Sequence, residues 1–256
     1  MTDAPPPREI IPAATLVIFR HAAGGGPPEL LMVQRSQQMR FAGGASVFPG
    51  GRIDPADHDL AKQIAPDADR EDTAARIAAI RETLEETGLM VGLDLSIPAA
   101  QAIEARALLL TCGALGPVLD QFGWKLKLDH LTYFARWCPN HTRSFDTWFY
   151  LADIGTGAVT TRVDATENTR LFWISAADAL TMADAGEISV IFPTRRNLER
   201  LALFNSHAEA VAQAQAIPAR MIAPSTLERD GELFLTISEG LGYPITEQSM
   251  KSVRRG

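Results

Sequence analysis

The chain has 256 residues, of which 46% are hydrophobic and 21% are charged, and it carries a formal net charge of −7 at pH 7. The length allows one sizeable core, and the composition is that of a folded globular protein, not of a disordered one. The acidic balance argues against a general role on nucleic acid or on a membrane surface, and no apolar run reaches the length of a membrane span.

Three features of the chain bear on its compartment. The N-terminus has neither a basic start nor an apolar core, so we expect no signal peptide. The two cysteines, Cys112 and Cys138, lack the spacing of metal ligands and are typical of a reducing compartment. The sequence ends in Arg254-Arg255-Gly256 and not in a peroxisomal Ser-Lys-Leu signal. We therefore expect a cytoplasmic protein.

The first part of the chain predicts a strand hairpin that leads into a glycine turn. After an expected flexible tail over residues 1–12, Ala13 to Arg20 and Glu29 to Arg35 have strand character and flank a Gly-Pro turn. Val47-Phe48-Pro49-Gly50-Gly51 then indicates the end of a strand that runs into a Gly-Gly turn.

The next element carries the most informative cluster of charges. Glu82, Glu85 and Glu86 have the spacing of one helix face, and a helix with this pattern is expected to stop at Gly88. Ile77, Ile80 and Leu84 point the opposite way, as core residues would. Because like charges at this spacing repel, a cation among them would stabilise the helix, and carboxylates suit Mg²⁺ or Mn²⁺ better than zinc. The alternative is a solvated acidic face without a metal.

The remaining elements alternate between helices and strands. We expect a helical insert over residues 98–123, and strands at Tyr133 to Trp137, Thr147 to Ala152 and Leu171 to Ile174. The other expected elements are a helix from Ala176 to Ala183, a long helix from Thr194 as N-cap to about Ala216, a strand from Leu233 to Ile237, and a tail over residues 241–256.

The segment Arg81-Glu82-Thr83-Leu84-Glu85-Glu86-Thr87-Gly88-Leu89, after a Gly-Gly turn, resembles the signature of the Nudix hydrolases, G-x5-E-x7-R-E-U-x-E-E-x-G-U, where U is a bulky aliphatic residue. The resemblance implies an α/β fold, a Nudix-type α/β/α sandwich with a mixed sheet, as a single domain over residues 13–240 with a C-terminal helix. It also implies a metal-dependent diphosphatase in which Glu82, Glu85 and Glu86 bind Mg²⁺ or Mn²⁺ and Arg81 orients one of them. Glu167 is the candidate for a later catalytic carboxylate, and the alternative for it is a solvated turn residue.

The first half of the signature departs from the family pattern. Arg81 follows Gly51 by 30 positions where the family has 14, so 16 extra residues lie between the turn and the helix. After five intervening residues, the family's first glutamate is replaced by Asp57; counted back from Arg81, the same position falls on Thr73. We expect the insert, about residues 57–72, to be a surface loop that ends in a helix N-terminus at Asp69-Arg70-Glu71-Asp72.

A second motif bears on the substrate. Arg35-Ser36, Arg40, Gly44 and Phe48-Pro49-Gly50-Gly51 keep the spacing R-[SA]-x3-R-x3-G-x3-F-P-G-G. This resembles the element that precedes the Nudix box in coenzyme A diphosphatases. Guanidinium groups bind phosphate oxygens with paired hydrogen bonds, so Arg35, Arg40, Gly50 and Gly51 are candidate substrate residues. The alternative is that the arginines are surface charges beside a strand.

The segment from Arg143 to Phe149, together with the long insert, resembles the branch of coenzyme A diphosphatases whose Nudix box is interrupted. Arg143 and Asp146 are expected to hold the substrate or a covering loop, with an ordinary ion pair as the alternative.

Three functions stay open at this point: a coenzyme A or acyl-coenzyme A diphosphatase, a Nudix pyrophosphatase for ADP-ribose, NADH or a dinucleoside polyphosphate, and a non-catalytic nucleotide sensor. The expected partner is a small-molecule diphosphate, without nucleic acid or membrane, and a homodimer stays possible.

Overall fold

The computed structural model describes residues 8–39, 42–154 and 168–253. Within these ranges, eight strands form one mixed sheet in the order β3-β2-β1-β6-β5-β8, with β4 paired to β1 and β7 paired to β2. The strands of this sheet are β1 (Glu9–Arg20), β2 (Glu29–Arg35), β3 (Ser46–Val47), β4 (Gly50–Arg52), β5 (Thr132–Trp137), β6 (Arg143–Asp153), β7 (Asn168–Ser175) and β8 (Met221–Ile222).

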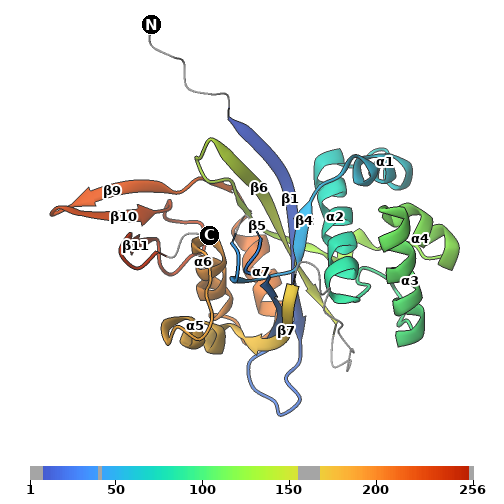
Figure 1. Ribbon diagram of the computed structural model, residues 1–256, viewed down its shortest axis with the longest axis horizontal. Helices are drawn as coiled ribbons and strands as arrows, with labels where there is room; N and C mark the ends of the chain where they lie inside the picture. The colour runs from blue at the N-terminus through green and yellow to red at the C-terminus, as the bar shows by residue number, and fades with distance from the viewer. Residues whose placement is uncertain (1–7, 40–41, 155–167, 254–256) are drawn as a thin grey trace, which may run out of the picture.

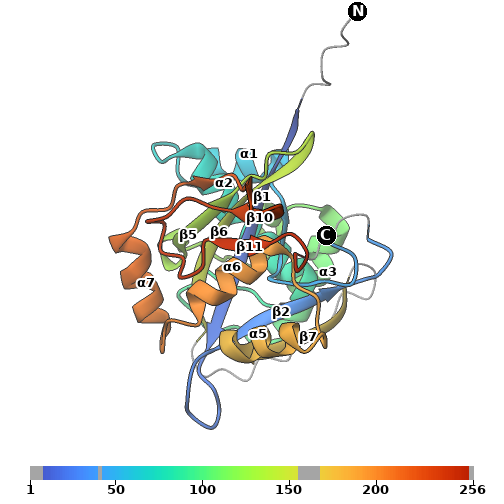
Figure 2. The same ribbon diagram turned by 90° about the vertical axis from the view of Figure 1, so that its left-hand side faces the viewer.

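Strand β1 lies at the centre of the sheet and divides the core between the two faces. It pairs with β6 in parallel along its length, and its apolar side chains alternate between two buried clusters. Leu16 and Ile18 pack under helices on one face, and Val17 and Phe19 pack under helices on the other. Figure 1 shows helices α1 to α4 on one side of the sheet and α5 to α7 on the other, and Figure 2 shows the second group in front of the strands. The predicted α/β/α sandwich with a mixed sheet is confirmed.

The residues between the glycine turn and the box helix are mostly helical, so the prediction of a surface loop is wrong. Helix α1 (Pro55–Ile64) is followed by a short turn, and α2 (Arg70–Thr87) then carries the box. Pro55 stands at the first helical turn, where its missing N–H costs nothing, and the Asp57 carboxylate accepts the N–H of Asp54 at 2.9 Å. A polar segment with this start can form a helix whose Leu60 and Ala61 join the core.

The helical insert forms as expected, whereas the long C-terminal helix does not. Helices α3 (Ala99–Cys112) and α4 (Leu115–Phe122) match the predicted range and pack beside α1 and α2. The expected helix from Thr194 to Ala216 is two helices, α6 (Phe192–Leu201) and α7 (His207–Ala216), after α5 (Ala176–Asp184). Ser206 caps α7 by accepting the N–H of Glu209, and this cap starts a new helix where one continuous helix was expected.

Both expected tails contain ordered strands. Strand β1 begins at Glu9, inside the predicted tail over residues 1–12, because Ile11 is buried and the strand is paired with β6 from its first residue. Strand β11 (Glu247–Ser249) lies inside the predicted tail over residues 241–256. It forms a small antiparallel sheet with β9 (Ser225–Arg229) and β10 (Glu232–Thr236).

Candidate active site

The box helix α2 has the orientation that its apolar residues dictate. Asp69 caps its N-terminus by accepting the N–H groups of Glu71 and Asp72, and Gly88 ends it with a φ of 76°. Ile77, Ile80 and Leu84 are fully buried, as the sequence predicts. The opposite face therefore presents the glutamates toward β4.

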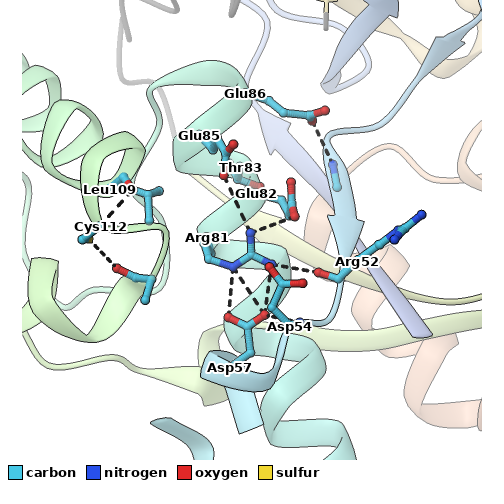
Figure 3. A network of polar contacts seen from close by, with 12 residues as sticks. Arg52, Asp54, Asp57, Arg81, Glu82, Thr83, Glu85, Glu86, Leu109 and Cys112 are labelled. Carbon is cyan, nitrogen blue, oxygen red and sulfur yellow. Dashed lines mark hydrogen bonds and ion pairs between the residues drawn. The ribbon is translucent and has the colours of Figure 1, made fainter. Parts of the chain in front are cut away.

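Gly50 and Gly51, which were predicted to form a turn, are the first two residues of strand β4. This strand approaches the glutamate face of α2 so closely that a side chain at Gly51 would not fit. Strand β4 pairs antiparallel with β1, with Gly51 opposite Ala14. A Cβ atom at Gly51 would collide with the carboxylate of Glu82. The backbone N–H of Gly50 donates to Oε2 of Glu86 at 3.0 Å (Figure 3). Glycines at these positions let the backbone contact two carboxylates of the box.

Glu86 is the most enclosed of the three glutamates, with 4% of its surface exposed. Its Oε1 accepts a hydrogen bond from Nδ2 of Asn168 at 3.2 Å, and its Oε2 accepts that of Gly50. Burial raises the pKa of Glu86 to about 8, and the charge of Glu82 adds to the rise, while the two hydrogen bonds act against it. The carboxylate is thus held in one orientation but favours a proton when no cation is near.

Glu82 and Glu85 lie beside a single guanidinium. Arg81 Nη1 is 2.8 Å from Oε1 of Glu82 and 3.7 Å from Oε2 of Glu85. Burial raises the pKa of Glu82 to about 7, although the charge of Arg81 lowers it. Arg81 therefore contacts two of the predicted metal ligands, and its orienting role stays a prediction.

Arg81 is anchored on its other side by Asp57 (Figure 3). Both side chains are buried, and the Nη2 of Arg81 is 3.0 Å from Oδ2 of Asp57 and 2.8 Å from the carbonyl oxygen of Arg52. Burial alone would lower the pKa of Arg81, but the hydrogen bond to Asp57 and the charge of Glu82 raise it above its ordinary value. Of the two candidates for the first acidic position of the box, Asp57 and Thr73, it is therefore Asp57 that pairs with Arg81.

The chemistry of these groups fits a hard divalent cation. The buried Glu86 and the half-buried Glu82 both have raised pKa values, and the side chain of Glu85 is 38% exposed. All three would offer oxygen ligands, and a cation would offset their mutual repulsion. Among the residues that the structure describes, however, no three His, Cys, Asp or Glu side chains converge closely enough to hold an ion by themselves. The three carboxylates would thus supply only part of the ligands of such a cation.

Arg35 is the predicted phosphate-binding residue that the structure brings to the carboxylates. It ends β2 and is paired in register with Asn168 on β7. Burial is the largest cause of the raised pKa of Glu86, and the nearby charge of the Arg35 guanidinium lowers that pKa. The Nε of Arg35 is buried and has no hydrogen-bond partner. Arg40 and Glu167, the other predicted residues of this group, lie outside the described residues.

The sequence and the structure can now be compared with known proteins. A family model for the NUDIX domain matches residues 11–101. The crystal structure of a NUDIX hydrolase from Alicyclobacillus acidocaldarius superposes with a TM-score of 0.70 at 31% sequence identity, and the match covers 80% of this chain and 96% of that one. The chain belongs to the Nudix hydrolases.

A curated relative of this Nudix hydrolase is the acyl-coenzyme A diphosphatase NUDT19 of Gallus gallus. The two are 28% identical over a match that covers 68% of this chain. The chain spans 61% of the length of that relative. No helix within the described parts of the Nudix hydrolase is long and apolar enough to cross a membrane.

Arg143 and Asp146 are not part of the carboxylate cluster. Arg143 is 53% exposed and forms an ion pair with Glu9 at 3.1 Å. Glu9 on β1 is paired with Arg143 on β6, and Thr15, six positions further along β1, is paired with Gly50. At the usual rise per strand residue, Arg143 therefore lies about 20 Å from Gly50.

Asp146 is 9% exposed and is held by Arg136, whose Nε and Nη2 donate to the two carboxylate oxygens at 2.8 and 2.6 Å. For both residues, the described contacts agree with the ordinary ion pair that the sequence left open.

Two residues of the Nudix site were not singled out by the sequence. Asn168 contacts Glu86 although it follows a segment without any clear pattern, and its only signal was its position beside Glu167. Arg106, on α3, donates from Nε to the carbonyl oxygen of Glu85 at 2.8 Å. Its spacing in the insert gave no sign of this contact, because only the packing of α3 against α2 brings the two together.

Proposed function

We propose that this Nudix hydrolase cleaves the diphosphate of coenzyme A or acyl-coenzyme A and releases 3′,5′-ADP and phosphopantetheine or its acyl derivative. The observation that carries the proposal is the position of Arg35, the first arginine of the substrate motif, beside the buried Glu86. The likeness to an acyl-coenzyme A diphosphatase over 68% of the chain supports the same substrate class.

In this proposal the arginines of the site bind the substrate and the glutamates bind the metal. Arg35 binds a phosphate group, and Arg40 binds the additional phosphate on the ribose of coenzyme A. Glu82, Glu85 and Glu86 would hold Mg²⁺ or Mn²⁺. When bound, such an ion neutralises the charge of the diphosphate and acidifies water. Gly50 and Arg81 keep two of the carboxylates in place.

The reaction itself needs one water and one base. Water adds to a phosphorus of the diphosphate, the bond from that phosphorus to the bridging oxygen breaks, and a general base accepts the proton of the water. We propose Glu167 as this base because it directly precedes Asn168, which contacts Glu86. The leaving phosphate carries away the bridging oxygen.

Two other functions remain as outcomes of a test. A pyrophosphatase for ADP-ribose, NADH or a dinucleoside polyphosphate would use the same carboxylates but not the arginine motif. A non-catalytic sensor is disfavoured because all three box glutamates, Glu82, Glu85 and Glu86, are present, and loss of the metal ligands would be the simplest route to such a role. The cytoplasmic location and the homodimer stay predictions from the sequence.

The test is a diphosphate panel with the full-length protein and Mg²⁺ or Mn²⁺, its products separated by chromatography. The panel holds coenzyme A, acetyl-coenzyme A, ADP-ribose, NADH and a diadenosine polyphosphate, and Glu86→Gln is the inactive control. We expect 3′,5′-ADP from the coenzyme A species at the highest rate in the panel. Faster turnover of ADP-ribose or NADH would replace the proposed substrate, and no turnover at all would favour the sensor.

A paired substitution tests the role of the motif. Arg35→Ala should raise the KM for coenzyme A about ten-fold or more, as loss of a charged hydrogen bond does. Arg170→Ala is the matched control, because Arg170 is an exposed arginine on the adjacent strand whose guanidinium stacks on Phe172. Equal KM values for the two variants would contradict phosphate binding by Arg35.

A further inference from the structure

Asn168 occupies a position in the candidate site that nothing in the Nudix signature predicts. It is the first residue of β7, and only 1% of its surface is exposed. Its Nδ2 donates to one oxygen of Glu86 at 3.2 Å, while the N–H of Gly50 donates to the other at 3.0 Å. Asn168 of β7 and Gly50 of β4 thus each hold one oxygen of the same carboxylate.

The amide oxygen of Asn168 points to a ligand. Its Oδ1 is buried and has no hydrogen-bond partner. When Glu86 is ionised, as it is beside a bound cation, the reverse orientation of the amide would place Oδ1 against a Glu86 oxygen and would be unfavourable. A buried amide oxygen without a partner is destabilising, so native sites of this kind are completed by a donor or a cation.

A divalent cation fits this oxygen better than another protein group does. Asparagine carbonyl oxygens are ordinary ligands of Mg²⁺ and its relatives. The carboxylates of the described residues do not converge in threes on one point, so the acidic cluster needs oxygen atoms of another kind. Among the described residues, Nε of Arg35 is a donor without a partner whose charge acts on Glu86. It does not bond to Asn168, although Arg35 and Asn168 are paired in register.

We propose that Asn168 is part of the metal site, where its amide nitrogen holds Glu86 and its amide oxygen is a ligand of the cation. The inference rests on the proposed function insofar as that function requires a divalent metal, and it adds a neutral ligand from a second element to the carboxylates of α2. This ligand would add an oxygen from the first residue of β7 to the carboxylate oxygens of the box helix. Asn168 would thereby make β7, the strand before α5, part of the metal site.

The test measures metal binding without substrate. Mn²⁺ is titrated into the full-length protein, and the free ion is followed by electron paramagnetic resonance. Asn168→Ala removes both contacts and should weaken Mn²⁺ binding about ten-fold or more. Asn168→Asp keeps an oxygen at the ligand position and adds a charge, so it should bind Mn²⁺ at least as tightly as the natural protein, although it loses the hydrogen bond to Glu86.

A matched variant controls for the loss of a buried amide. Asn197 on α6 is also fully buried, bonds to Tyr243 at 2.8 Å and has one amide atom without a partner. Asn197→Ala should leave the affinity for Mn²⁺ within two-fold of that of the natural protein. Thermal unfolding without metal verifies that each variant is folded before its titration is interpreted.

Two results would overturn the inference. Mn²⁺ binding by Asn168→Ala within two-fold of the natural protein would exclude Asn168 from the site. Equal weakening in Asn168→Ala and Asn168→Asp would mean that only the hydrogen bond to Glu86 matters and that Oδ1 is no ligand. Because the readout needs no substrate, a protein that binds Mn²⁺ through Asn168 but turns over nothing in the diphosphate panel would refute the proposed function and leave the inference standing.

Discussion

Asp57 and Arg81 form a buried ion pair that joins the inserted helix α1 to the box helix α2. Nε and Nη2 of the arginine donate to the carboxylate at 3.0 to 3.3 Å, and the side chains are 1% and 4% exposed. The same guanidinium reaches Glu82 at 2.8 Å. The pair therefore connects a residue 24 positions upstream to the carboxylates of the candidate metal site.

Removal of Asp57 should leave a charged arginine without its main partner. We expect Asp57→Ala to lower the free energy of unfolding by about 3 kcal/mol, because the buried Arg81 then loses its fully buried partner and keeps only weaker or more exposed ones. Urea denaturation measures the change. Asp57→Asn, which keeps an acceptor but not the charge, should lose less. A loss below about 1 kcal/mol for Asp57→Ala would mean that Glu82 and the Arg52 carbonyl suffice to hold Arg81.

Gly51→Ala should disturb Glu82 more than it disturbs the fold. The new methyl group would collide with the end of a flexible side chain, which can rotate away. We expect metal-dependent hydrolysis to fall ten-fold or more, as displacement of a metal ligand does, with a small change in melting temperature. The control is Gly116→Ala on α4, where a Cβ would meet Leu60 at an ordinary 3.9 Å. Equal activities of the two variants would contradict the role of the close approach.

The stability of the metal-free protein should fall as pH rises. The pKa values of Glu82 and Glu86 are raised to about 7 and about 8 in the folded protein, from 4.5 for the ordinary group. Between about pH 4.5 and pH 8 the folded state binds more protons than the unfolded state, so the free energy of unfolding decreases as pH rises. The stabilisation from the protonated Glu82 and Glu86 is fully present below about pH 4.5 and is lost as pH rises through about 8. Urea unfolding with a chelator at a series of pH values measures it.

A double substitution isolates these two groups from the other titrating residues. Glu82→Gln combined with Glu86→Gln should remove most of the decrease, since neither side chain can then ionise. Saturating Mn²⁺ should reduce the decrease in the natural protein, because the ion binds the deprotonated carboxylates. A natural protein and a double variant with the same pH dependence would refute the raised pKa values as its cause.

Arg106 should stabilise the end of the box helix. Its guanidinium bonds to the Glu85 carbonyl, and α2 has no basic residue of its own in its last turn. We expect Arg106→Ala to cost about 1–2 kcal/mol of unfolding free energy. Activity should also fall, because the backbone of Glu85 and Glu86 is less restrained, and Arg106→Lys should recover part of both.

The control for Arg106 is Arg229→Ala, which breaks an exposed ion pair with Glu247 and should cost less than about 0.5 kcal/mol. If Arg106→Ala costs no more than this control in urea denaturation, then the contact between α3 and the box helix does not contribute to stability.

The sequence predicted the parts of the molecule that local patterns determine. Apolar periodicity identified the buried face of α2, and the acidic residues of Asp69-Arg70-Glu71-Asp72 marked its first turn. Gly50 and Gly51 were predicted to form a turn, but they begin strand β4, and their contacts with Glu82 and Glu86 follow from the pairing of β4 with β1. Such contacts depend on the sheet and have no signal in a short window.

The errors have the same physical origin. The polar insert was predicted as a loop because its capping residues were given less weight than its charge, although only a few apolar side chains of α1 are needed to bury it against α2 and α4. The break between α6 and α7 was missed because Ser206 is an unremarkable residue until its hydroxyl caps a helix. Asn168 could not be found from the sequence, since its partner lies 82 positions away.

The parallel pairing of β1 with β6 also determines when the protein can fold as it is synthesised. Glu9 pairs with Arg143, 134 positions later in the chain, so a nascent chain that stops before β6 has one edge of β1 without its partner. Contacts over such long separations form late and leave strand edges open to other chains in the meantime. Although the box helix is complete once the ribosome has made Gly88, its Glu86 acquires the contact with β7 only when the growing chain has reached Asn168.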